Sequence, residues 1–239
     1  MIVHRIFSPL RKWLPAKVSR RIRSAFTGLL TPFYFSKETG HFRSAILSKA
    51  VDKMGEPIPW YTYPAIDLLN RKNFSSCRVM EFGAGQSTLW WSKRCRELLS
   101  FEPNASWYSY LRGRVLANVQ LYHLPYNLEG LEACLGTQQF DVIIVDGFDR
   151  LKACQVARRC LKPDGAIILD NSDGIWGPTG PIVETGIPNP IMDFFRAEKF
   201  SRVDFFGYAP GVFSPYCTSL FFKDQCFLLE GRENPVAVL

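Results

Sequence analysis

The chain has 239 residues, of which 47% are hydrophobic and 14% aromatic, so it is long enough to bury a large core. Its seven cysteines are an odd number without a CxxC pair, which argues against a disulfide framework or a zinc site and favours a reducing compartment. No apolar run reaches the roughly 18 residues that span a bilayer, and no continuous apolar segment of a signal peptide is present. We therefore expect a cytoplasmic protein.

The net charge of +7 is concentrated in an N-terminal arm, residues 1–36. Seven of the 29 Lys and Arg residues lie in this arm, which has no Asp or Glu, and the other 22 balance the 22 Asp and Glu of the remaining chain. The chain beyond the arm is therefore electrically neutral, which disfavours a domain that binds nucleic acid over a broad basic surface.

The arm has the pattern of a basic amphipathic helix. After Pro15, a favoured first-turn residue, apolar residues recur at helical spacing, namely Val18, Ile22, Phe26 and Leu29. Such a helix can lie on an anionic membrane surface, so residues 1–30 are a candidate membrane-binding segment, with Trp13 and Phe26 entering the interface. Packing of the apolar stripe on the chain's own domain or on a partner subunit is the alternative.

Residues 37–75 form a second region, which we expect to be a helical lead-in. Apolar residues from Phe42 onward predict a helix that ends near Lys53, with Gly55 as its C-cap. Pro64 can open a further short helix.

From position 77 the chain alternates between short apolar runs and helical or mixed stretches, of which 151–161 is the clearest helix. Five runs about 20 residues apart predict parallel strands joined by crossovers. These runs are Arg78–Phe82, Leu98–Glu102, Gln120–Leu124, Asp141–Asp146 and Ala166–Asp170. Near the C-terminus, RVDFFGYAP and TSLFFKD have no helix between them and predict an antiparallel pair at one edge of the sheet.

The loop after the first predicted strand, EFGAGQST, contains two glycines next to a carboxylate. Ligands of open parallel sheets bind beyond the carboxyl ends of the strands, where this loop lies. Glu81 would repel a pyrophosphate but attract an ammonium, and Thr88 stands where a dinucleotide motif has its third glycine. S-adenosylmethionine has no phosphate and is cationic. Glu102, 17 residues after Gly85, is placed to accept its ribose hydroxyls.

With EFGAGQS, Glu102, FDVIIVDG and LKPDGAIILD, residues 75–225 resemble the class I S-adenosylmethionine-dependent methyltransferases. The resemblance implies an α/β, Rossmann-like sheet of seven strands, mostly parallel with an antiparallel last strand, helices on both faces and a helical N-terminal extension. It divides the chain into the arm 1–36, the lead-in 37–75 and a methyltransferase domain 76–239. Ser87 departs from the family's third glycine, and we expect it to cap the following helix.

By the same resemblance, S-adenosylmethionine is bound by residues of the glycine loop and of the neighbouring strand ends. They are Glu81, Gly83, Ala84, Gly85, Ser87, Thr88, Glu102, Pro103, Leu124 and Asp146.

Acidic residues at the ends of the fourth and fifth strands suggest a catalytic site. Asp146, Asp170 and Asn171 offer oxygen ligands that could converge on one hard cation. They resemble the Mg²⁺ ligands of metal-dependent small-molecule O-methyltransferases, in which the ion lowers the pKa of the acceptor hydroxyl. Acidic strand ends without a metal are the alternative, and turn or capping roles are expected for Asp149 and Asp173.

Together these features predict an S-adenosylmethionine-dependent methyltransferase of a small molecule or glycan, with a lipid-linked acceptor as one option and O-methylation as the favoured reaction. An RNA methyltransferase that uses the basic arm and a non-catalytic S-adenosylmethionine-binding partner protein are the competing interpretations, and a homo-oligomer is open. The segment 173–190, rich in Gly and Pro, is a candidate substrate lid. The aromatic residues Trp60, Tyr61 and Tyr63 are candidates for a pocket wall or for the core.

Overall fold

The computed structural model describes residues 15–177, 180–182 and 189–229; of residues 175–177 and 180–182 it describes the backbone alone. Its helices are α2 (Ala16–Thr39), α3 (His41–Leu47), α4 (Tyr63–Asn70), α5 (Gln86–Ser92), α6 (Ala105–Arg112), α7 (Leu131–Leu135), α8 (Arg150–Cys160) and α9 (Pro190–Ala197). Its strands are β1 (Arg78–Phe82), β2 (Glu97–Glu102), β3 (Val119–His123), β4 (Phe140–Val145), β5 (Leu161–Leu169), β6 (Ile175–Gly177), β7 (Gly180–Ile182), β8 (Ser201–Gly207) and β9 (Tyr216–Phe222). None of these helices is long and apolar enough to cross a membrane.

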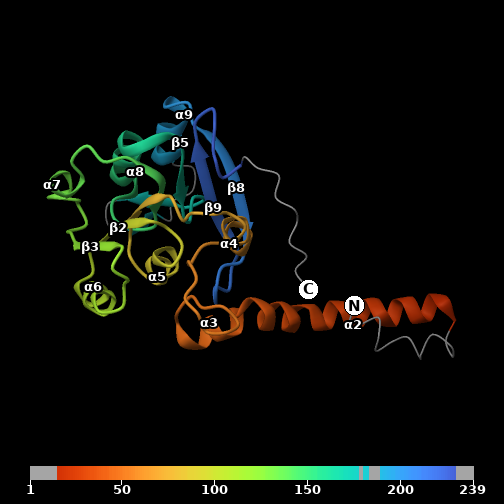
Figure 1. Cartoon of the computed structure of the whole chain (residues 1–239). Coiled ribbons are helices and arrows are strands. Elements are labelled where there is room, and N and C mark those ends of the chain that lie inside the picture. The colour runs from red at the N-terminus through yellow and green to blue at the C-terminus, as the bar shows by residue number, and fades with distance from the viewer. Residues whose placement is uncertain (1–14, 178–179, 183–188, 230–239) are drawn as a thin grey trace.

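Seven strands form one twisted sheet in the order β3-β2-β1-β4-β5-β9-β8 (Figure 1). Strands β1 to β5 run parallel, and β9 runs antiparallel to both β5 and β8. This confirms the expected fold class, including the antiparallel pair at the edge. The strand order reverses between β1 and β4, so a crevice opens beyond their carboxyl ends.

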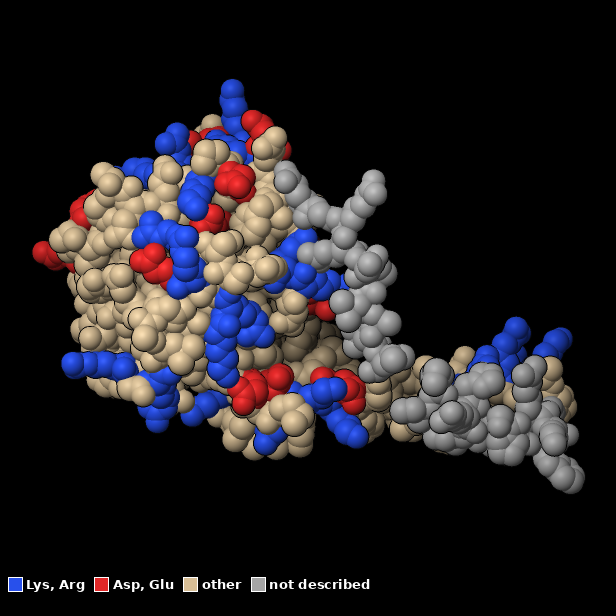
Figure 2. Space-filling view, viewed as in Figure 1, with Lys and Arg blue, Asp and Glu red and all other residues tan. Residues whose placement is uncertain are grey.

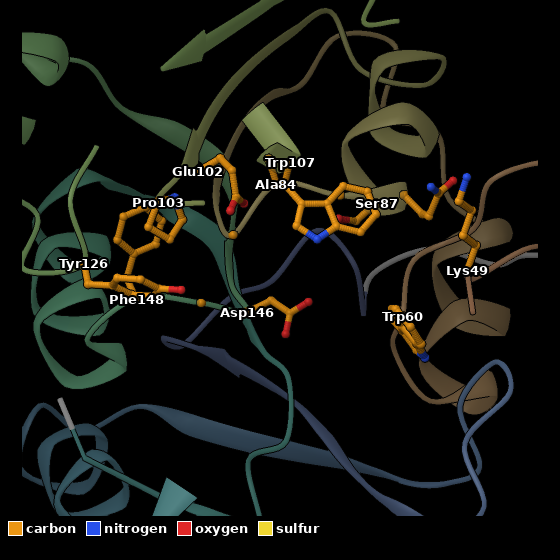
Figure 3. A pocket seen from close by; sticks show the side chains of 14 residues that line it. Lys49, Trp60, Ala84, Ser87, Glu102, Pro103, Trp107, Tyr126, Asp146 and Phe148 are labelled. Carbon is orange, nitrogen blue, oxygen red and sulfur yellow. The ribbon is translucent and has the colours of Figure 1, made fainter. Parts of the chain in front are cut away.

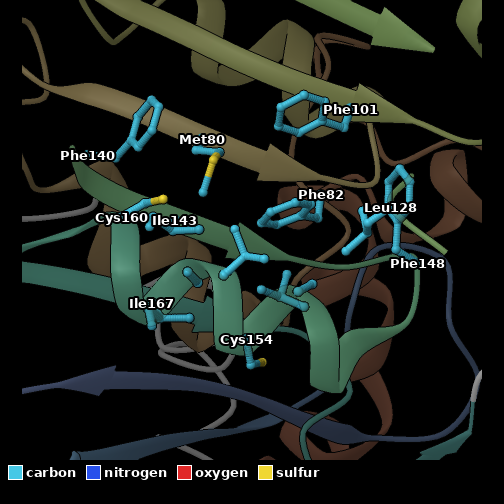
Figure 4. Packing of buried hydrophobic residues seen from close by; sticks show 14 of the residues in the cluster. Met80, Phe82, Phe101, Leu128, Phe140, Ile143, Phe148, Cys154, Cys160 and Ile167 are labelled. Atoms are coloured by element: carbon cyan, nitrogen blue, oxygen red, sulfur yellow. The ribbon is translucent and has the colours of Figure 1, made fainter. Parts of the chain in front are cut away.

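Both faces of the sheet are buried, which explains why its central strands are continuous apolar runs. Successive residues of β1 point to opposite faces, so Val79 and Met80 belong to different hydrophobic clusters. Helices α7, α8 and α9 cover the Met80 face, where Cys154 and Cys160 of α8 pack beside aromatic and aliphatic side chains of the strands (Figure 4). Helices α4 and α5 cover the other face. All seven cysteines are unpaired, and all but one are buried, as expected for small hydrophobic side chains.

The N-terminal helix α2 extends away from the sheet domain (Figure 1). It begins directly after Pro15, as predicted, and has no buried residue. It ends at Gly40, whose φ of 75° is left-handed and from which α3 starts immediately. A Cβ at Gly40 would lie 2.3 Å from the carbonyl carbon of Asp52, so only glycine fits this corner. Trp13 lies outside the described residues.

The prediction that this helix ends near Lys53 is wrong, because α3 stops at Leu47. The Oγ of Ser44 donates to the carbonyl of Val51 and accepts from its amide, which folds the chain back. The carboxylate of Asp52 then accepts the amides of Met54 and Glu56, so Gly55 belongs to a turn and not to a helix cap.

Beyond the arm, Lys and Arg side chains are interspersed with Asp and Glu on the surface, as Figure 2 shows for one face. The segment 173–190 contains a short antiparallel pair, β6 with β7, where an irregular segment was expected. Residues 178–179 and 183–188 of the candidate lid lie outside the described residues, and the role of this segment as a substrate lid stays a prediction.

Candidate functional site

A pocket opens at the carboxyl ends of β1, β2 and β4, in the crevice where the strand order reverses (Figure 3). It is lined by Lys49, Trp60, Gly83, Ala84, Gly85, Gln86, Ser87, Glu102, Pro103, Trp107, Tyr126, Asp146, Gly147 and Phe148. The glycine loop therefore forms one wall, as predicted. The lead-in segment contributes Lys49 and Trp60 from far upstream in the sequence.

The two glycines of the loop serve different purposes. Gly83 has a φ of 100°, and a Cβ there would lie 3.0 Å from the backbone of Asp146, so the fold itself requires glycine. Gly85 has an extended φ of −174°, and a Cβ there would meet nothing within 4 Å. Because Gly85 lines the pocket, the space that its missing side chain leaves is available to a ligand.

Glu81 lies behind the loop and is not part of the pocket wall that the described residues form. Its buried carboxylate accepts hydrogen bonds from Ser87 Oγ at 2.5 Å, Thr88 Oγ1 at 2.6 Å and Ser100 Oγ at 2.7 Å. Burial raises the pKa of Glu81 to about 7, although the three hydroxyl groups oppose that rise. The assignment of Glu81 to a ligand ammonium is therefore corrected: its carboxylate holds the loop against β2.

Ser87 does not cap the helix that follows the loop. The N-cap of α5 is Gly85, whose amide donates to Thr88 Oγ1 at 2.9 Å. Ser87 is one residue inside the helix, where its hydroxyl reaches back to Glu81. The expected capping role is thus replaced by an anchoring role, although Ser87 also lines the pocket.

Glu102 lines the pocket at the end of β2, where the sequence places a ribose acceptor. Its side chain is 5% exposed, and one carboxylate oxygen accepts the amide of Asn104 at 2.8 Å. Burial raises the pKa of Glu102 to about 7, and hydrogen bonds from backbone amides partly oppose the rise. A carboxylate in a pocket wall that has acceptor positions beyond this bond is suited to accept hydrogen bonds from hydroxyl groups of a ligand.

Asp146, Asp170 and Asn171 come together as predicted, but a side chain of the protein lies between them. The guanidinium of Arg150, at the start of α8, donates to the carbonyl of Asp170 and lies 3.4 Å from Asp146 Oδ1 and 3.5 Å from Asn171 Oδ1. Arg150 is 6% exposed. The cation that these oxygens surround is therefore an arginine.

This donor set does not fit a metal ion. The carboxylate of Asp170 accepts the hydroxyl of Thr218 at 2.6 Å, its backbone carbonyl accepts from Arg150, and Asp170 is 2% exposed. In the described ranges no group of three His, Cys, Asp or Glu side chains could hold an ion. The expected Mg²⁺ ligands Asp146, Asp170 and Asn171 are therefore reinterpreted as the partners of a buried guanidinium.

Only Asp146 of this set lines the pocket; Asp170 and Asn171 are not among its lining residues. Burial raises the pKa of Asp146 to about 6, and the nearby guanidinium of Arg150 limits that rise. Asp149 caps α8 by accepting the amide of Lys152 at 3.2 Å, and Asp173 accepts the amide of Cys217 at 3.1 Å. The expected capping role of Asp149 is confirmed, whereas Asp173 ties the turn after β5 to β9.

Leu124 lies in the hydrophobic core, 8% exposed, and not in the pocket wall. The aromatic end of the pocket is formed by Tyr126 and Phe148 together with Pro103 (Figure 3). Leu124 points inward because its amide continues the β2–β3 ladder by donating to the carbonyl of Glu102. The prediction that Leu124 binds the cofactor is therefore corrected, because Leu124 does not line the pocket.

Several pocket residues were not identified from the sequence. Lys49 approaches the hydroxyl of Tyr110 at 3.4 Å, and the buried Nε2 of Gln86 has no hydrogen-bond partner among the described residues. Trp107 comes from α6. Of the aromatic residues before the sheet only Trp60 lines the pocket, since Tyr61 is fully buried in the core.

The fold is shared with known methyltransferases at low identity. The precorrin-6y C5,15-methyltransferase of Geobacter metallireducens superposes with a TM-score of 0.50 at 16% identity, over 67% of this chain and 87% of that one. An rRNA methylase of Streptococcus thermophilus has a TM-score of 0.47 at 12% identity, over 66% and 93%. A TehB-like SAM-dependent methyltransferase of Corynebacterium glutamicum has 0.46 at 14%, over 66% and 86%. No protein-family model and no curated protein matches the chain.

The chain therefore has the class I methyltransferase fold. At this level of identity the likeness concerns the sheet and its helices, and it leaves the ligand and the reaction to be argued from the pocket.

Proposed function

We propose that the protein is an S-adenosylmethionine-dependent methyltransferase that methylates a hydroxyl group of a small molecule or glycan. The observation that carries the proposal is the pocket at the switch point of the sheet, which an open glycine position, Gly85, and the Glu102 carboxylate both line. The carboxylate that ends β2 is suited to a ribose with free hydroxyl groups, which the adenosine of S-adenosylmethionine provides.

The order of residues along the pocket supports S-adenosylmethionine as its ligand (Figure 3). Tyr126 and Phe148 offer flat apolar surfaces for adenine at one end. Glu102 in the middle accepts the ribose hydroxyls. Lys49 and the unpartnered amide of Gln86 at the other end can bind the methionine carboxylate.

Asp146 is the residue that we assign to the reacting centre. S-adenosylmethionine supplies a methyl group bound to a positively charged sulfur, which is transferred to a nucleophile in line with the breaking bond. Asp146 faces the pocket and would favour that positive charge, orient the acceptor hydroxyl and take its proton as the new C–O bond forms. The products are then S-adenosylhomocysteine and a methyl ether.

Trp60 is suited to position the acceptor. Its side chain is 38% exposed and lies at the pocket wall opposite the aromatic adenine end (Figure 3). An exposed indole of this kind stacks on sugar rings and aromatic rings. Together with the balanced charge of the chain beyond residue 36, this favours a small acceptor over a nucleic acid.

Isothermal titration calorimetry of the full chain tests the proposal. S-adenosylhomocysteine should bind one to one with micromolar affinity, and NAD⁺ should bind much more weakly, because Thr88 stands where the dinucleotide pattern has its third glycine. Absence of S-adenosylhomocysteine binding would overturn the proposed cofactor. Incubation with S-adenosylmethionine labelled on its methyl group and a panel of phenols, catechols and sugars then tests the acceptor class.

A further inference from the structure

One face of α2 and α3 is apolar, and several of its described side chains are exposed. Along α2 this face follows Val18, Ile22, Phe26, Leu29 and Phe33, which recur every three or four residues. Phe33 is 70% exposed, and no residue of the helix is buried. A stripe of this length on the surface of a protein needs an explanation, because apolar side chains in contact with water cost free energy.

The stripe does not pack on the sheet domain, because α2 turns a different face to it. The ring of Phe35 lies 5.4 Å from that of Tyr63 and 6.4 Å from that of Tyr208. Residues two apart are about 200° apart around an α-helix, so Phe33 points nearly opposite to Phe35. The contact with the domain thus holds the helix with its apolar stripe turned outward.

The apolar surface continues onto α3. Phe33 and Phe42 line one surface groove together with Pro32, and Phe42 is 66% exposed. Ile46, one helical turn after Phe42, is 67% exposed. We call the combined surface the docking face; it consists of Val18, Ile22, Phe26, Leu29, Phe33, Phe42 and Ile46.

The charges around the docking face are almost all positive. Between residues 15 and 37 the sequence has no Asp or Glu, and Lys17, Arg20, Arg21 and Arg23 lie on the first half of α2. Figure 2 shows Lys and Arg gathered at the outer end of the helix. The first acidic residue, Glu38, is paired with Lys53 at 2.8 Å.

This pattern disfavours a second copy of the chain as the partner. Two copies that paired through α2 would bring one basic segment against another, since α2 has no carboxylate to offer except Glu38 at its end. Nucleic acid would neutralise the charge but would leave the row of apolar side chains in water. An anionic lipid surface satisfies both properties at once, because its headgroups attract the arginines while its acyl region takes the apolar side chains.

We propose that the docking face binds membranes rich in anionic lipid, with α2 lying in the plane of the interface. The apolar stripe enters the headgroup region, and Arg21 and Arg23, which lie about 100° to either side of it around the helix, contact lipid phosphates, while Lys17 and Arg20 add positive charge near the surface. The proposal rests on α2 and α3 and is independent of the reaction assigned to the pocket.

Vesicle flotation of the full chain tests the proposal. The protein should float with phosphatidylcholine vesicles that contain about one third phosphatidylserine and not with pure phosphatidylcholine, and added salt should weaken binding. The double variant Arg21→Glu/Arg23→Glu should bind at least roughly twentyfold more weakly, since each basic residue near such a surface contributes about fivefold. The double variant Leu29→Glu/Phe33→Glu should lose binding at any salt concentration.

Matched controls separate the docking face from general surface effects. Leu116→Glu introduces a charge at a 49% exposed apolar residue outside the docking face, and Arg159→Glu reverses an exposed basic residue on α8; both should float like the wild type. The α2 variants should keep the unfolding midpoint of the wild type, because α2 has no buried residue.

Three results would overturn the proposal. One is flotation that does not distinguish anionic from neutral vesicles, or no flotation at all. Another is a dimer in analytical ultracentrifugation that Leu29→Glu/Phe33→Glu dissociates, which would assign the face to a second copy. The third is binding of single-stranded RNA that depends on Arg21 and Arg23 in the absence of vesicle binding.

Discussion

Acidic residues stand at the carboxyl ends of both halves of the central sheet, Glu81 and Glu102 on β1 and β2, Asp146 and Asp170 after β4 and β5. In the first half one carboxylate is fully engaged by hydroxyl groups and the other faces the pocket. In the second half the guanidinium of Arg150 lies between the strand ends. A strand-end carboxylate is therefore open to a ligand where it lines the pocket, as at Glu102 and Asp146, and not where other side chains of the chain satisfy it in the interior, as at Glu81 and Asp170.

Replacing Arg150 by methionine should disrupt the interactions at the ends of β4 and β5 and leave those at the ends of β1 and β2 intact. Asp146 and Asp170 would lose their buried cation, so the free energy of unfolding should fall by about 3–5 kcal/mol. Urea denaturation measures this fall. The exposed pair of Arg159 with Glu132 is the control, since Arg159→Met should change stability by less than about 1 kcal/mol. A variant as stable as the wild type would contradict the role of Arg150.

Replacing Glu102 by alanine tests the first half. Loss of a charged acceptor for the ribose hydroxyls should weaken S-adenosylhomocysteine binding by about 2 kcal/mol, roughly 30-fold, in calorimetry. Removal of Glu129, an acidic residue exposed on the surface, should leave the affinity unchanged. An unchanged affinity in Glu102→Ala, with the fold intact, would exclude Glu102 as the ribose acceptor.

The two glycines of the loop offer a matched pair of substitutions. Gly83→Ala should destabilise the fold by about 1–3 kcal/mol, because it forces a left-handed φ and a contact with the Asp146 backbone. Gly85→Ala should keep the unfolding midpoint but weaken S-adenosylhomocysteine binding by about tenfold, because its methyl group enters the pocket. Equal effects of both on stability would contradict the distinction.

The pH dependence of binding should also follow Glu102. Its pKa of about 7 means that the carboxylate is mostly protonated at pH 6 and mostly ionised at pH 8. Only the ionised form accepts two ribose hydroxyls, so affinity should rise about tenfold across this range. Calorimetry at both pH values measures the rise. In Glu102→Gln it should disappear; a rise that persists would assign the titration to another group.

Most of the sheet could be predicted from its sequence, because strands buried on both faces are continuous apolar runs. β1 was predicted with its observed bounds, and the edge pair β8 and β9 was recognised from the missing helix between them. The end of the helix expected to reach Lys53 was not predicted correctly, because helix propensity favours its continuation. Only the contact of Ser44 with Val51 reveals that the chain reverses there. That contact depends on side-chain geometry which periodicity does not encode.

The site was predictable where a residue's role follows from its place on a strand, and not where it depends on partners. Glu102 follows from the end of β2. The engagement of Glu81 depends on the register that sets Ser100 beside it on β2, and on helix residues Ser87 and Thr88. The reach of Arg150 depends on the rotamer of a long side chain. Lys49 enters the pocket through a turn that the sequence did not reveal.

Gly40 has a consequence for orientation. It joins α2 to α3 without an intervening loop, in a backbone conformation that contact with Asp52 permits only to glycine. The chain reaches the pocket wall at Lys49 within a few residues of this corner. A surface bound along α2 would therefore meet the pocket mouth at a constant angle. Gly40 would thus determine how the pocket mouth is oriented relative to that surface.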